Sequence, residues 1–146
     1  MDGLLYYKCK HFQICELVDQ ATYREFGEDA WSFFRPNLLI SLDNVREYYD
    51  IAVTVNNWRD GGQFSERGLR ILNPGDKAIY SPYSEHAHGN AVDYDVKGKT
   101  AEQVRQDILN HKDDDPFKLI MALEKGTNWV HMDCRNVPDR IVLFNS

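Results

Sequence analysis

The chain has 146 residues, of which 42% are hydrophobic, and it carries a formal net charge of -6 at pH 7. This length predicts one domain, spanning 1–146, with a core of its own. The acidic balance argues against a broad nucleic-acid surface or a polybasic membrane anchor, and no apolar run approaches the roughly 18 residues that span a bilayer. We therefore expect neither nucleic acid nor a membrane as partner, while the oligomeric state stays open.

The cysteines and the N-terminal residues indicate the cellular compartment in which the chain is made. Cys9, Cys15 and Cys134 are odd in number and form no C-x-x-C pair, which favours free thiols in a reducing compartment. The start, "MDGLLYYKCKHFQ", lacks the basic segment and long apolar core of a secretory signal. We expect synthesis in the cytoplasm without a signal peptide.

The first third of the chain predicts two helices and a strand. Residues 12–26 carry apolar side chains near one face of an amphipathic helix, and 35–50 repeat the pattern with Pro36 at a suitable start. Residues 51–58 are β-branched and short, which is typical of a strand, and a glycine turn follows. Residues 1–45 thus form a helical N-terminal part that resembles no sequence we can place.

The middle of the chain predicts a loop, a strand and a helix. Prolines and glycines exclude a long helix from 66–89. Residues 90–98, "NAVDYDVKG", alternate as a strand does, and 100–111 predict a helix for which Thr100 is a plausible cap.

Three further elements complete the prediction. Residues 115–126 are expected to form a short helix that ends at a glycine, and 128–135 and 140–145 to form strands. The predicted class is α+β: a small, mainly antiparallel sheet that carries a metal site and is flanked by helices.

Two stretches concentrate polar side chains: "SPYSEHAHGNAVDYDV", 81–96, and "NWVHMDCR", 128–135. Side chains two apart on a strand point to the same side. Asp93 and Asp95 would therefore share one face of the first strand. On the second strand, one face would carry Trp129, His131 and Asp133.

These faces suggest a metal site. His86 lies seven residues before Asp93, across a Gly89 that permits a turn, and the second strand offers His131. Two imidazoles and one carboxylate leave an open position on tetrahedral zinc, which is the catalytic arrangement. His88 is an alternative third ligand, because it would share a face with His86 if that segment were extended.

The first stretch also resembles a known family. The pattern S-x-H-x-x-G-x-A-x-D is matched at all five fixed positions: Ser84, His86, Gly89, Ala91 and Asp93. It marks the zinc D-Ala-D-Ala carboxypeptidase family, which includes D,D-carboxypeptidases, D,D-dipeptidases, phage endolysins and the Hedgehog signalling domain as a structural cousin.

The second stretch, "WVHMDCR", resembles the second motif of that family, so that the likeness covers roughly residues 50–135 in motif order. The resemblance implies a zinc ion held by His86, Asp93 and His131.

One position departs from the family pattern. Many members place a catalytic acidic residue three before the last histidine, where this chain has Asn128. An amide cannot accept the proton of an attacking water, and a general base must lie within hydrogen-bond reach of it. We expect Asp133 to substitute as the catalytic base, with Glu124 as the second choice. If neither reaches the water, the site binds zinc without hydrolysis.

Candidate substrate contacts surround these ligands. Arg67 and Arg70 lie where relatives place a substrate-binding arginine, and an arginine fork suits a carboxylate, although both could lie on a solvated face. Ser84 could bind a substrate carboxylate or cap a turn. His88 could contact substrate or be solvated. Trp129 is expected to wall the site and could floor a groove.

The functional expectation is a zinc metallopeptidase, a D,D-carboxypeptidase or endopeptidase that hydrolyses stem peptides of bacterial peptidoglycan. A chain without a signal peptide suits a phage-type lytic enzyme that is released onto the cell wall or carried in a virion. The alternative is a zinc-binding structural or binding module of the same fold that has no hydrolytic activity. The sequence does not determine which stem-peptide bond is cut.

Overall fold

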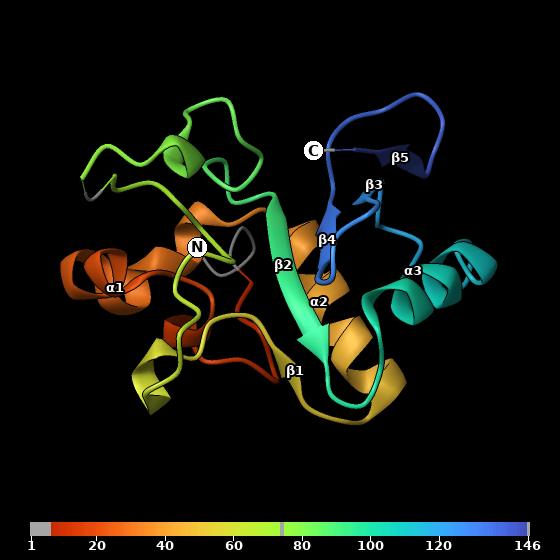
Figure 1. Ribbon diagram of the computed structural model, residues 1–146, viewed down its shortest axis with the longest axis horizontal. Helices are drawn as coiled ribbons and strands as arrows, with labels where there is room; N and C mark the ends of the chain where they lie inside the picture. The colour runs from red at the N-terminus through yellow and green to blue at the C-terminus, as the bar shows by residue number, and fades with distance from the viewer. Residues whose placement is uncertain (1–6, 74, 146) are drawn as a thin grey trace.

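The computed structural model describes residues 7–73 and 75–145 (Figure 1). Residues 1–6, part of the predicted helical N-terminal region, and Pro74 lie outside this description. The α+β class is confirmed, because the described part combines α-helices with a five-stranded sheet. The helices are α1 (Gln20–Phe26), α2 (Pro36–Tyr49) and α3 (Ala101–Asn110).

The sheet is mixed, with the strand order β1-β2-β4-β3-β5. The prediction of a mainly antiparallel sheet is wrong in this respect. The first three neighbouring pairs are antiparallel, but β5 runs parallel to β3 because the chain loops back after β4 before it joins the edge (Figure 1). The strands are β1 (Val53–Thr54), β2 (Ala91–Val96), β3 (Ala122–Glu124), β4 (Val130–Asp133) and β5 (Val142–Phe144).

The predicted helix over 12–26 is interrupted. A short 3-10 turn, Ile14–Glu16, is followed by an extended segment in which Leu17 O accepts a hydrogen bond from Leu69 N. This close approach depends on Gly68, because a Cβ there would lie 2.0 Å from Leu17 O. The apolar residues of the pattern are buried, but tertiary pairing replaces the middle of the helix.

The predicted helix over 115–126 is wrong. Its first half forms turns, and Ala122–Glu124 form β3 against β4. A continuous apolar run fits a buried strand as well as a buried helix, so its periodicity cannot decide between them. Pairing with β4 decides it here.

The remaining elements follow the sequence closely. α2 begins at Pro36, and Thr100 caps α3 in a reciprocal arrangement with Gln103. Such a cap typically stabilises a helix by about 1 kcal/mol. The strand expected over 51–58 is reduced to Val53–Thr54, and the described part of 66–89 contains no α-helix.

The two longer helices cover one face of the sheet. α2 packs against β2, α3 packs against β2 and β4, and Figure 1 shows α2 behind the central strands. The alternate residues Val92, Tyr94 and Met132 are fully buried in the resulting core. The opposite face is thereby left to the polar residues of the same strands.

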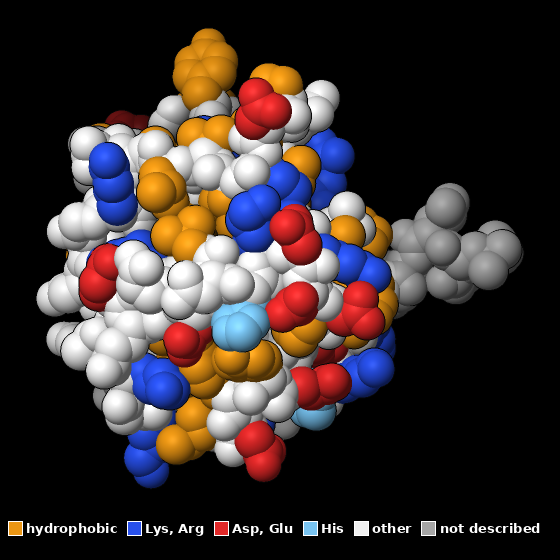
Figure 2. Space-filling view, turned by 90° about the vertical axis from the view of Figure 1, so that its right-hand side faces the viewer, with side chains coloured by type: hydrophobic (Ala, Val, Ile, Leu, Met, Phe, Trp, Pro, Cys, Tyr) orange, Lys and Arg blue, Asp and Glu red, His pale blue; other side chains and the backbone are white. Residues whose placement is uncertain are grey.

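The described residues include no helix that is both long and apolar enough to cross a membrane. On the face shown in Figure 2, Lys and Arg side chains are interspersed with Asp and Glu, and neither sign forms a broad patch.

Candidate metal centre

A row of polar side chains crosses three strands. Asp93 on β2 is paired with His131 on β4, and His131 is paired on its other side with Glu124 on β3. Paired residues on neighbouring strands point to the same face, with Cβ atoms about 5 Å apart. The register of the sheet therefore aligns these three side chains side by side, and Phe144 on β5 continues the row.

His86 reaches this row from a compact turn. The backbone N–H of His86 donates to Ser84 Oγ, and Gly89 ends the turn with a φ of 66°. A Cβ on Gly89 would lie 2.0 Å from Phe33 O, so no other residue fits without displacing the backbone. The segment is not extended, which removes the premise on which His88 was expected to share a face with His86.

The second nitrogen of His86 is fixed by the backbone. His86 Nδ1 lies 2.9 Å from the carbonyl oxygen of Gly68, which can only accept a hydrogen bond. Nδ1 therefore carries a proton, and Nε2, which faces Asp93 Oδ1 at 3.4 Å, is the nitrogen that is available to a metal. Metal-bound histidines commonly show this arrangement, in which the other ring N–H is held by a protein oxygen.

His86, Asp93 and His131 form a compact group of potential ligands. One ligand atom from each lies within 4.8 Å of the other two, and all three residues are buried. Two imidazole nitrogens and one carboxylate oxygen suit zinc, as well as other divalent transition metals. The donor set therefore fits a metal ion, with the identity of the ion left open.

In the absence of a metal, His131 and Asp93 share a proton that a metal ion would have to displace. Burial lowers the pKa of His131, but hydrogen bonds to Asp133 and Asp93 outweigh burial and raise this pKa to about 9. Burial raises the pKa of Asp93, but hydrogen bonds from His131 and His86 outweigh it and hold this pKa well below its usual range. Without metal, a proton between His131 Nδ1 and Asp93 Oδ1, 2.8 Å apart, takes the place of a cation.

Asp133 does not face the position between His86, Asp93 and His131 that a metal would occupy. Its Oδ2 lies 2.9 Å from His131 Nε2, at the ring edge away from the nitrogen that meets Asp93. Asp133 is fully buried, and its carboxylate also accepts hydrogen bonds from the Arg135 side chain at 2.8 and 2.6 Å. These contacts do not support the expected role of Asp133 as general base; they are those of a residue that orients His131.

Glu124 lies on the face of the sheet that carries the ligands, directly opposite His131. It lines a hollow of about 450 Å³, here called the metal hollow, together with the three potential ligands. The described residues supply its carboxylate with no hydrogen bond or ion pair, and the charged group that acts on it electrostatically is Arg70 of the same hollow. Among the two bases considered from the sequence, the geometry favours Glu124.

The two candidate substrate arginines have partners within the fold. Arg70 lines the metal hollow and forms an ion pair with Asp93 Oδ2 at 3.3 Å, so it contacts a potential ligand directly. Arg67 is buried and pairs with Asp95 at 3.0 Å, in a neighbouring hollow. A substrate carboxylate that bound either arginine would have to compete with the aspartate to which that arginine is paired.

The other predicted contacts are divided between hollows. Ser84 and Trp129 line the metal hollow, and Ser84 also caps the turn before His86. His88 is exposed, lies 3.0 Å from Pro82 O through Nε2, and lines a different hollow. Asn128 lies beside Arg67 and does not line the metal hollow.

The residues that the sequence did not assign to the site include Phe144, Arg135 and Arg105. Phe144 lines the metal hollow because β5 joins the sheet beside β3, and Arg135 lines it while it binds Asp133. Arg105, buried on α3, donates to the carbonyl oxygens of Thr127 and Trp129 and so holds the turn before β4. Of these residues, only Arg135 could have been found from the sequence, because it follows Asp133 by two residues.

Comparisons of the chain with family models, with curated proteins and with solved structures gave no match. The case for a function therefore rests on the residues and their geometry.

Proposed function

We propose that the protein is a zinc metallopeptidase that hydrolyses peptide bonds in the stem peptides of bacterial peptidoglycan. One observation carries the proposal: two histidines and an aspartate from three separate segments converge in the lining of a hollow that opens to the surface. Three protein ligands leave a coordination position for water or substrate, as catalytic zinc sites do.

Zinc bound there would acidify a coordinated water and polarise the scissile carbonyl. Glu124, which faces the same hollow, accepts the proton of the attacking water and returns it to the leaving nitrogen. Asp133 orients His131, and the Gly68 carbonyl orients His86. Arg70 lies beside Asp93, where its positive charge can stabilise an oxygen that becomes negative during attack.

The assignment of stem peptides as substrate rests on the resemblance of the residues around His86 and His131 to the zinc D-Ala-D-Ala carboxypeptidase family. The mixed lining of the metal hollow, with Trp129 and Phe144 beside charged groups, is compatible with a peptide that has both apolar and charged parts. A phage-type lytic role remains part of the proposal.

The test uses purified protein loaded with one equivalent of zinc and incubated with purified peptidoglycan. We expect mass spectrometry to detect released peptide fragments, chelation to stop the release, and added zinc to restore it. Stoichiometric zinc without any fragment would instead favour a zinc-binding module without hydrolytic activity. A chain that binds no metal would exclude both functions.

A further inference from the structure

The metal hollow is the middle of three neighbouring hollows. Glu85 and Arg135 line both the metal hollow and a second one of about 440 Å³, here called the Arg35 hollow. Asp93 and Trp129 line both the metal hollow and a third one, here called the Phe64 hollow. Each neighbour therefore shares wall residues with the central hollow, which contains the potential ligands.

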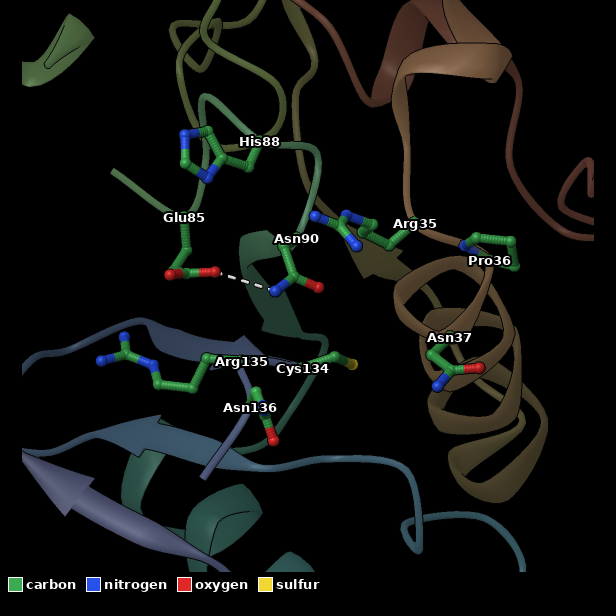
Figure 3. A pocket seen from close by; sticks show the side chains of 9 residues that line it. All are labelled: Arg35, Pro36, Asn37, Glu85, His88, Asn90, Cys134, Arg135 and Asn136. Atoms are coloured by element: carbon green, nitrogen blue, oxygen red, sulfur yellow. Dashed lines mark hydrogen bonds between the residues drawn. The ribbon is translucent and has the colours of Figure 1, made fainter. Parts of the chain in front are cut away.

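The Arg35 hollow lies between the start of α2 and the turn that carries His86 (Figure 3). Arg35 N donates to Gly89 O at 2.9 Å, which fixes the two segments to each other. In Figure 3, Glu85 and Arg135 lie across the hollow from Pro36 and Asn37. The Arg35 hollow therefore has walls from both segments and from the end of β4.

Arg35 provides the uncommitted positive charge of this hollow. Its side chain is exposed, and no described residue gives its guanidinium a hydrogen bond or ion pair. The other charged groups are engaged: Arg135 binds Asp133, and Glu85 accepts a hydrogen bond from Asn90 at 2.8 Å. A carboxylate that entered the hollow would find Arg35 available for a charge-assisted hydrogen bond.

The Phe64 hollow differs in chemistry. Phe64 and Trp129 supply aromatic surface, and the Arg67 guanidinium lies over the Phe64 ring at 4.1 Å. Arg67 is neutralised by Asp95. The Phe64 hollow is therefore suited to apolar and backbone contacts with an extended peptide rather than to a free carboxylate.

We propose that the substrate runs through all three hollows, so that the protein is an endopeptidase that cuts an internal peptide bond while Arg35 binds a carboxylate away from that bond. The inference rests on the proposed function. An enzyme that removes one C-terminal residue must bind the terminal carboxylate next to the metal, yet the arginines there, Arg70 and Arg135, are paired with Asp93 and Asp133. The unpaired arginine lies one hollow further away.

The experiment compares peptidoglycan and soluble stem peptides of stepwise shorter length as substrates of the zinc-loaded protein. An endopeptidase releases fragments of two or more residues, whereas a carboxypeptidase releases single amino acids. We expect the larger fragments, and a fall in kcat/KM once shortening removes the carboxylate that reaches Arg35.

Arg35→Ala tests the subsite. It should lower kcat/KM on the long substrate roughly 3- to 30-fold, the range of a charge-assisted contact at a partly exposed site, and leave the shortest cleaved substrate unaffected. Arg24→Ala is the matched control, because Arg24 is also exposed and lies on α1, outside the three hollows. It should behave as the unaltered protein on every substrate.

Release of single residues only, or equal loss by Arg35→Ala on long and short substrates, would overturn the inference while the proposed function stands. If no substrate is cut, the proposed function fails and the endopeptidase activity fails with it, and binding then decides whether a peptide occupies the three hollows and meets Arg35. Addition of the long peptide to the zinc-loaded protein should then shift the backbone amide resonances of Gly89, Asn90 and Cys134, with no shift in Arg35→Ala. Absence of that shift in the unaltered protein would overturn the inference as well.

Discussion

Oδ2 of Asp133 lies 2.9 Å from Nε2 of His131, at the edge of the imidazole ring opposite the nitrogen that meets Asp93. This relationship assigns the two aspartates different tasks. Asp93 shares the potential metal position with His131, whereas Asp133 holds the ring and the Nε2 proton in place. Removal of such an orienting carboxylate typically costs 10- to 100-fold in metal affinity or activity.

Asp133→Asn should therefore weaken zinc binding roughly 10- to 100-fold and lower activity with it. Competition with a chelator of known affinity measures the zinc affinity. Asp95→Asn is the control, since Asp95 lies on the same sheet but pairs with Arg67. If Asp133→Asn kept full zinc affinity and lost turnover alone, Asp133 would be the base after all.

Glu124→Gln should lower kcat roughly 100- to 10,000-fold, because the amide keeps the shape of the side chain and removes the proton acceptor. Zinc content and thermal stability should stay close to those of the unaltered protein. Glu25→Gln, at an exposed position on α1, is the control. Turnover of Glu124→Gln at the normal rate would exclude Glu124 as the base.

Removal of the metal should destabilise the fold. A ligand that binds only the native state stabilises it by about 2.7 kcal/mol at a free concentration 100 times its Kd. For a chain of this size we expect the Tm to fall by about 5 to 10 °C on chelation. The check is calorimetry with metal content measured on the same sample; an unchanged Tm after confirmed metal loss contradicts the prediction.

The raised pKa of His131 predicts a pH dependence in the metal-free protein. Its pKa is about 9 in the fold and about 6.5 in an unfolded chain. The folded state therefore holds an extra proton between these values, and its stabilising effect is complete below the lower pKa and lost as pH rises through the higher one. Because zinc must displace that proton, zinc affinity should rise over the same interval.

Denaturant midpoints of the chelated protein at pH 6.5 and 8 measure this effect. We expect the midpoint to fall with pH, and the chelated His131→Gln variant to show a smaller fall. A midpoint that rose with pH by the same amount in both proteins would rule out His131 as its source.

Much of the site follows from local sequence. The turn before His86 and the alternation of β2 and β4 are encoded by neighbouring residues, and Gly89 supplies the positive φ with which the turn ends. A pattern with fixed short spacings can predict such an arrangement, because few long-range contacts intervene. The same holds for α3, where Thr100 and Gln103 define the first turn.

The features of the site that could not be predicted from the sequence depend on pairing between strands that are distant in the chain. Glu124 faces the ligands because β3 pairs with β4 and sets it opposite His131. A helix over 115–126 would have carried no such register. Likewise, strand alternation correctly predicts that Asp133 and His131 share a face, but it cannot tell which ring nitrogen meets which carboxylate.

The central claim, that His86, Asp93 and His131 hold one metal ion, is tested most directly by counting zinc. The unaltered protein and four alanine variants, His86→Ala, Asp93→Ala, His131→Ala and His88→Ala, are loaded with zinc, passed through gel filtration and analysed for metal per chain. We predict one zinc in the unaltered protein and in His88→Ala, and loss of tight binding in the other three variants. Loss of zinc in His88→Ala together with retention in His131→Ala would contradict the ligand set.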